Sequence, residues 1–148
     1  MLKPIAIATL VAGTLDIVFA MILSLLFGRE IGNMLRYVAS GPFPAATGMG
    51  AAGALLGLLV HFALMAVMAA VFVIFAREQP RSLDRPLLSG LLYGLITYIV
   101  MNWVVVPVRF DTALPPRLLS MATQLFAHLV LVGIPIALVT RRFLRARA

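Results

Sequence analysis

Residues 5–27 read IAIATLVAGTLDIVFAMILSLLF, and Asp16 is the one charged side chain among them. A helix of about 20 apolar residues is long enough to cross the ~30 Å hydrocarbon core of a bilayer. An ionised carboxylate at the centre of that core costs between about 2.5 and more than 10 kcal/mol, so it has to face protein, water or a partner. This segment therefore predicts a membrane-spanning helix with a costly polar group at its middle.

Three further apolar runs predict three more membrane helices. The four expected spans cover residues 5–27, 51–76, 87–106 and 117–139. The chain has 148 residues, of which 63% are hydrophobic and 11% are charged, so the spans leave no room for a soluble domain. The sequence thus predicts an all-α membrane protein, a four-transmembrane-helix bundle that forms a single integral membrane domain over residues 1–148. Pro107 should close the third span, because proline lacks the backbone donor that a helix needs.

The segment 29–40 is amphipathic rather than uniformly apolar. Its apolar side chains recur at helical spacing, at Ile31, Met34, Leu35 and Val38. This pattern predicts a short interfacial helix after the first span. Prolines in the segment 41–44 should end it.

The net charge of +7 arises from 12 basic and 5 acidic residues. The basic residues flank apolar spans instead of forming a soluble basic module, so no nucleic-acid partner is expected. Eight of the 12 lie in the N-terminus, the second connection and the C-terminal tail, and the positive-inside rule then places both termini in the cytoplasm. The arginine-rich C-terminus should meet anionic lipid headgroups of the bilayer. The sequence has no cysteine, which excludes disulfides and thiolate metal sites.

Both histidines of the chain, His61 and His128, lie at the depth of Asp16 in their own spans. At ~1.5 Å rise per residue, the three side chains fall within about two turns of the membrane midplane. Tyr98 occupies the same level in the third span, and Asn102 lies one turn further out. The sequence predicts that these five residues form a buried polar cluster.

Glycines share helix faces with the polar residues of the second and third spans. Residues four positions apart lie on the same side of a helix, and the glycine stripes lead to His61 and Tyr98. Small residues at this spacing let membrane helices approach closely. The glycines predicted to lie in helix-packing faces are Gly53, Gly57, Gly90 and Gly94.

Three interpretations of the Asp16, His61 and His128 set remain open. In the first, the carboxylate bonds one or both imidazoles and the set only satisfies buried polar groups. In the second, the residues form a proton or ion relay, since histidine titrates near neutral pH. In the third, His61 and His128 ligate haem b between helices, with Asp16 or Tyr98 beside the ligands.

Three charged residues outside the spans are candidates for a role at the outer opening of the bundle. Arg36 could cover that opening or bind a headgroup, or it could simply snorkel beside a surface helix. Arg109 and Asp111 follow Pro107 and could form a gate pair or an ordinary exposed ion pair.

Short stretches that together touch all four spans and the segment after the first span carry a family resemblance. They are 12–17 (AGTLDI), 35–41 (LRYVASG), 56–62 (LGLLVHF), Tyr93-Gly94 through Met101-Asn102 to Val106-Pro107, and His128 through Gly133 to Ala137. In their joint order they resemble a family of uncharacterised small bacterial four-helix inner-membrane proteins. The segment 42–44 departs from the glycine expected there. The resemblance implies a bacterial inner-membrane location and draws attention to Asp16, Arg36, His61, Asn102 and His128, but it implies no mechanism.

Enzyme motifs are missing from the sequence, which has no phosphate-binding glycine loop, no His-Glu-x-x-His and no Gly-x-Ser-x-Gly. We therefore expect a non-enzymatic membrane protein built around the Asp/His cluster, in its sharpest form a proton-linked or small-solute transport element. The alternatives are a bis-histidine haem protein of electron transfer and an accessory subunit of a larger membrane complex. A homo-oligomer is compatible with each of them.

Overall fold

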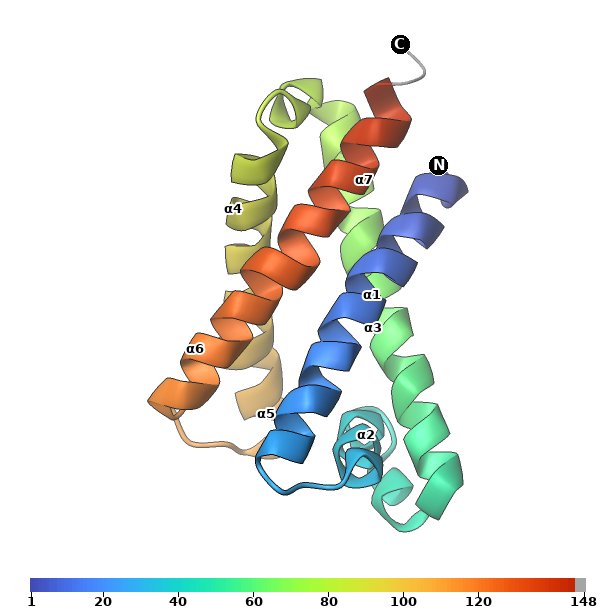
Figure 1. Ribbon diagram of the computed structural model, residues 1–148, viewed down its shortest axis with the longest axis vertical. Helices are drawn as coiled ribbons and strands as arrows, with labels where there is room; N and C mark the ends of the chain where they lie inside the picture. Colours follow the sequence, from blue (N-terminus) through green and yellow to red (C-terminus); the bar gives the residue numbers. More distant parts are fainter. Residues whose placement is uncertain (146–148) are drawn as a thin grey trace.

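The computed structural model describes residues 1–145, which form helices and connecting loops with no strand among them. Four helices in this range are long and apolar enough to cross a membrane. They are Leu2–Leu26, Gly50–Glu78, Pro86–Phe110 and Leu118–Arg145. The predicted class, an all-helical chain with four candidate spans, is thus confirmed. The N-terminus lies at the same end of the molecule as the end of the fourth span (Figure 1).

Shorter elements divide and connect these helices. The first span is α1 (Leu2–Leu26), followed by α2 (Ile31–Ser40), the 3₁₀ turn η1 (Pro44–Gly48) and the second span α3 (Gly50–Glu78). After the 3₁₀ turn η2 (Pro80–Leu83), the third span consists of α4 (Pro86–Ile99), the π-helical segment η3 (Val100–Val105) and α5 (Val106–Phe110). The fourth span consists of α6 (Leu118–Phe126), the π-helical segment η4 (Ala127–Gly133) and α7 (Ile134–Arg145).

Each π-helical segment ends two residues before a proline, Pro107 or Pro135. A proline within an α-helix has no N–H to donate, and its ring clashes with the carbonyl four residues earlier. A wider π turn relieves both problems, and the Val106 N–H accordingly bonds to the carbonyl of Met101, five residues back. The prediction that Pro107 closes the third span at residue 106 is therefore wrong, because the helix continues to Phe110.

The boundary between α1 and α2 also differs from the predicted one. Gly28 has φ +66°, and the N–H groups of Gly28 and Arg29 bond back to carbonyls in the last turn of α1. Such a left-handed glycine is a common helix terminator. The first span therefore ends at Leu26, and the second helix begins at Ile31 rather than at residue 29.

The second and fourth spans are longer than predicted. The second covers Gly50–Glu78 instead of 51–76, and the fourth covers Leu118–Arg145 instead of 117–139. Arginine and glutamate are good helix formers, so helices continue past the apolar residues into the charged flanks.

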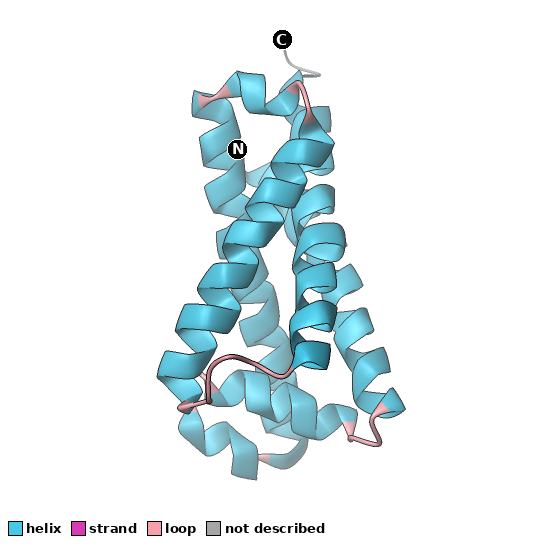
Figure 2. Cartoon of the chain, turned by 90° about the vertical axis from the view of Figure 1, so that its left-hand side faces the viewer, coloured by secondary structure: helices cyan, strands magenta, loops and turns pink. Residues whose placement is uncertain are grey.

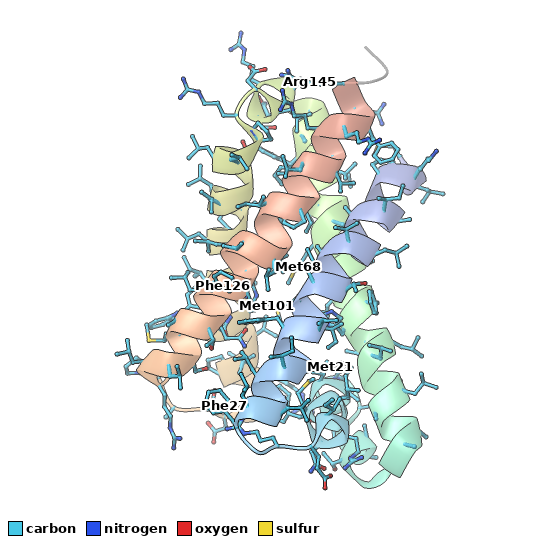
Figure 3. The ribbon with its side chains drawn as sticks, viewed as in Figure 1. Met21, Phe27, Met68, Met101, Phe126 and Arg145 are labelled. Carbon is cyan, nitrogen blue, oxygen red and sulfur yellow. The ribbon has the colours of Figure 1, made fainter. Side chains whose placement is uncertain are left out.

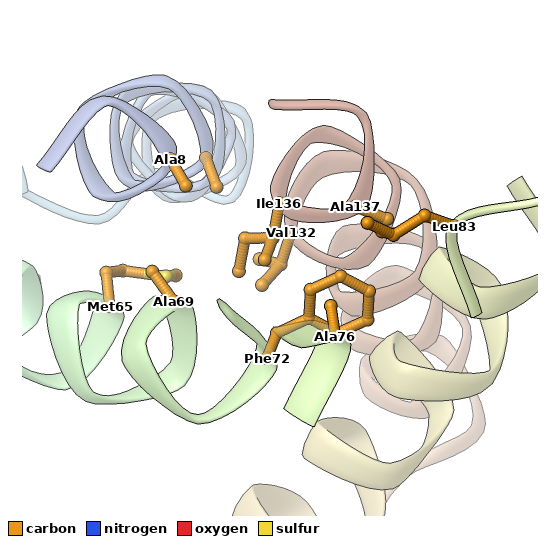
Figure 4. Close-up of a cluster of buried hydrophobic side chains, with 10 residues drawn as sticks. Ala8, Met65, Ala69, Phe72, Ala76, Leu83, Val132, Ile136 and Ala137 are labelled. Atoms are coloured by element: carbon orange, nitrogen blue, oxygen red, sulfur yellow. The ribbon is translucent and has the colours of Figure 1, made fainter. Parts of the chain in front are cut away.

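The main hydrophobic cluster lies between α1, α3 and the segment from η4 to α7 (Figure 4). Its members are Ala8, Ala12, Met65, Ala69, Phe72, Ala76, Leu83, Val132, Ile136 and Ala137. Half of them are alanines, which let helix backbones approach closely, and Phe72 fills the space between them. By contrast, at most 33% of the most apolar window of any span is buried inside the protein. The outward faces, whose side chains project in Figure 3, are thus apolar and suited to lipid.

The two predicted pairs of packing glycines contact different partners. A Cβ built on Gly90 would lie 2.8 Å from the Gly133 carbonyl oxygen, and one built on Gly94 would lie 2.7 Å from the Cα of Leu129. These glycines therefore bring α4 into backbone contact with η4. A Cβ on Gly57 would instead overlap the carbonyl of Leu35, which belongs to α2.

The helix α2 lies crosswise to the spans at the end opposite the N-terminus (Figure 2). It packs mainly on α3, with Leu35, Ala39 and Ser40 buried. Gly53 lets η1 approach α3 closely, because a Cβ there would overlap the carbonyl of Ala46 in η1. The face of α3 that carries Gly53, Gly57 and His61 is thus in contact with η1 at Gly53 and with α2 at Gly57.

Candidate functional site

Asp16 of α1 and His61 of α3 face each other. The Oδ2 atom of Asp16 lies 3.9 Å from Nδ1 of His61. The carboxylate side chain is 19% exposed and the imidazole side chain 10%. An acid and a base that share such a sparsely solvated space interact more strongly than they would in water.

A backbone carbonyl of α1 fixes the orientation of the His61 ring. His61 Nε2 lies 2.9 Å from the carbonyl oxygen of Gly13, which can only accept, so Nε2 carries the proton of this hydrogen bond. Gly13 also makes room for α3, because a Cβ there would lie 2.7 Å from the ring of Phe62. The absent side chain of Gly13 and its carbonyl together aim Nδ1 of His61 at Asp16.

This geometry allows one proton to be shared by Asp16 and His61. With Nε2 protonated, the pair holds either an imidazolium and a carboxylate or a neutral imidazole and a carboxylic acid. Both forms have no net charge. The separation of 3.9 Å is too long for a direct hydrogen bond, so a water molecule or a change of side-chain rotamer would have to connect the two groups.

His128 lies in η4 and is 8% exposed. Its Nδ1 donates to the carbonyl of Gln124 at 2.9 Å, which leaves Nε2 as the acceptor of the neutral ring. Within residues 1–145, no ion pair or hydrogen bond joins this side chain to Asp16, whose acid–base partner is His61. Of the two histidines, His61 is the one that the structure places beside the carboxylate.

Tyr98 connects His128 to the third span. The two rings meet edge to face, with centroids 6.0 Å apart. The Tyr98 hydroxyl accepts a hydrogen bond from Trp103 Nε1 at 3.3 Å, and the Tyr98 carbonyl accepts one from the side-chain amide of Asn102 at 3.3 Å. Asn102 thus bonds within its own helix, and within residues 1–145 no hydrogen bond joins it to Asp16.

Arg109 binds the end of α2, and within residues 1–145 no ion pair joins it to Asp111. Its guanidinium donates to the Ser40 carbonyl at 2.9 Å and to the Gly41 carbonyl. Cations stabilise helix C-termini, where carbonyls lack partners. Asp111 has φ +49° and terminates α5 in the left-handed conformation that aspartate tolerates.

Two further contacts join α2 to α5 and to α3. The rings of Tyr37 and Phe110 stack with centroids 4.4 Å apart, and partial burial raises the pKa of the Tyr37 phenol above its usual value of 10.0. Arg36 donates to the Gly50 carbonyl at 3.2 Å and to the side chain of Asn33. The guanidinium of Arg36 is therefore engaged in joining α2 to the start of α3.

We expect Arg109→Gln to loosen α2 while the spans stay folded. One hydrogen bond from a charged donor contributes about 1.5 kcal/mol, so amide hydrogen exchange in α2 should accelerate by about tenfold. Arg117→Gln is the matched control, since Arg117 lies on the same side of the molecule and makes no side-chain hydrogen bond within residues 1–145. Equal exchange in the two variants would exclude the docking role of Arg109.

The residues present do not fit a haem held by both histidines. His61 Nε2 is bonded to Gly13, and the remaining Nδ1 faces the Asp16 carboxylate at 3.9 Å, where the iron would have to lie. Within residues 1–145, no three His, Asp or Glu side chains are arranged to hold a metal ion.

Sequence reasoning missed two contributors to the site, the Gly13 carbonyl and Trp103. Backbone acceptors leave no signal in a pattern of side chains. Trp103 lies five residues after Tyr98 and reaches it through a π turn, whereas α-helical spacing favours residues three or four apart.

Comparisons of the chain with protein-family models, with curated proteins and with solved structures found no match. The resemblance to small bacterial four-helix inner-membrane proteins stays a prediction.

Proposed function

We propose that this chain is a multi-pass protein of a bacterial inner membrane that takes up and releases a proton at Asp16 and His61, as part of proton-linked transport of a small solute. In this proposal it is not an enzyme, and both termini lie in the cytoplasm. The observation that carries the proposal is the 3.9 Å approach of Asp16 Oδ2 to His61 Nδ1. Each group lies near the middle of a helix long enough to span the membrane.

The chemistry of the pair supports proton exchange. With one proton the pair is neutral, and without it a single negative charge is left in a medium of low dielectric constant. Isolated charges are unfavourable there, so the pair holds its proton until water or a conformational change stabilises the carboxylate. Acids and histidines inside membranes commonly mark proton pathways for this reason.

The position of α2 supports a role in controlling access to the pair. We assign α2 to the outer membrane surface as an interfacial helix. It packs on Gly57, which lies one helical turn before His61 on α3. Movement of α2 would therefore change the surroundings of His61 first, and Arg36 and Arg109 would hold it in place.

Proton flux into liposomes tests the proposal. Purified protein is reconstituted with a pH-sensitive dye inside the vesicles, and a potassium diffusion potential drives protons inward. We expect the wild-type chain to acidify the lumen and Asp16→Asn to reduce the rate to that of protein-free vesicles, because an amide cannot bind the proton. Asp111→Asn is the control, since it makes the same change outside the apolar core at a left-handed position that asparagine tolerates.

The result that contradicts the proposal is equal flux through wild type and Asp16→Asn when both variants show the same helix content and elute as the same species. The proposal includes proton passage through the pair in the absence of a solute, so no substrate has to be known for this measurement.

A further inference from the structure

A lipid-facing pocket lies between the start of α4 and the middle of α7. It has a volume of about 440 Å³. Its walls are formed by Arg85, Pro86, Leu87, Leu88, Leu138 and Arg141. The leucines are 42–56% exposed, so this is an apolar groove with two guanidinium groups.

Both arginines of the groove are free to bind an external anion. Within residues 1–145, the close pairs of an acidic and a basic side chain are Asp16 with His61 and Asp84 with Arg145, and neither involves Arg85 or Arg141. Their side chains also make no hydrogen bond in the same range. By contrast, Arg36 and Arg109 at the other end of the molecule are bonded to backbone carbonyls.

A neighbouring pocket of about 420 Å³ shows why this groove is distinctive. That pocket also contains arginines, but Asp84 contributes to its wall and forms an ion pair with Arg145. A carboxylate there neutralises part of the positive charge and repels an anion. The groove of Arg85 and Arg141 has no acidic residue in its wall.

The two arginines lie where the apolar spans end. Pro86 is the first residue of α4, and Arg141 follows the apolar part of the fourth span by two residues. This level corresponds to the headgroup region if the spans cross a bilayer. The first turn of α4 has no side-chain cap, so its N–H groups add positive potential.

We propose that this groove binds one anionic phospholipid, with the phosphate between Arg85 and Arg141 and an acyl chain along Leu88 and Leu138. Charge complementarity selects the phosphate, and the exposed leucines select a molecule that has an acyl chain. Basic pockets between transmembrane helices are suited to anionic headgroups. The site is independent of the proton pair, which lies on α1 and α3.

Native mass spectrometry of the full chain in detergent, titrated with phosphatidylglycerol, tests the proposal. We expect the double variant R85Q/R141Q to weaken binding by about thirtyfold. The double variant R29Q/R117Q removes the same charge at the opposite end of the molecule and should bind as the wild type does. Phosphatidylcholine should bind weakly to all three proteins.

Two further measurements keep the test decisive. Leu138→Trp fills the groove while both charges remain, and it should also weaken the binding of phosphatidylglycerol. This variant provides the test if R85Q/R141Q does not fold. Inorganic phosphate at millimolar concentration should leave phosphatidylglycerol bound. Equal binding by the two double variants, equal binding of the two lipids, or displacement of the lipid by free phosphate would each overturn the proposal.

Discussion

Gly94→Leu should prevent the third and fourth spans from packing together. The carbonyl oxygen of His128 occupies the place that a Cβ at residue 94 would take, and the Cα of Leu129 lies 2.7 Å from it. Both are backbone atoms, so no side chain can rotate away to make room. Overpacking usually costs about 1–3 kcal/mol, and a clash between two helix backbones should reach or exceed the top of this range.

Equilibrium unfolding in mixed micelles measures the effect of Gly94→Leu. Gly48→Leu provides the control, because a Cβ at Gly48 has nothing within 4 Å. We expect the control to unfold within about 0.5 kcal/mol of wild type, as surface substitutions usually do. If both leucine variants unfolded at the same denaturant concentration, the close contact of α4 with η4 would be wrong.

His61→Leu should destabilise the protein more than the joint replacement of Asp16 and His61 by leucine. The single change removes the hydrogen bond to Gly13 and leaves Asp16 without its base. Breaking a buried ion pair by removing one partner costs about 3–5 kcal/mol, whereas replacing both partners by apolar residues is often neutral. Since the Asp16 side chain is 19% exposed, we expect the single change to cost about 2–4 kcal/mol.

A double-mutant cycle with Asp16→Leu, His61→Leu and the double variant measures this coupling. Wild-type stability of the double variant together with loss of proton flux would assign the pair to function rather than to folding. If instead the change in unfolding free energy of the double variant equals the sum of the two single changes, the side chains of Asp16 and His61 do not interact.

The sequence predicted the spans well and their contacts poorly, for a physical reason. Long apolar runs specify spans because every backbone group in a bilayer has to be satisfied within the helix. Depth along a helix also follows from counting residues, and this count predicts a common level for Asp16 and His61, whose side chains lie 3.9 Å apart. The rotation of a helix about its axis and its neighbours depend on packing. The sequence alone could therefore not show that α2 packs against Gly57.

Arginine partners were equally inaccessible to sequence reasoning. Arg109 and Asp111 are close along the chain, and this spacing favours an ion pair. In the structure Asp111 lies in a left-handed turn and Arg109 donates to carbonyls at the end of α2, and neither feature can be recognised from a pattern of side chains.

The π turn before Pro107 has a consequence at the far end of the same helix. Each residue of an α-helix turns the chain by about 100°, and a π segment holds roughly one additional residue in its turn. The side chains of α5 are therefore rotated about the helix axis, by about that angle, from the directions that an uninterrupted continuation of α4 would give them. Pro107 thus influences the direction in which Arg109 leaves the helix, and through Arg109 it affects how the end of α2, almost 70 residues earlier in the chain, is held.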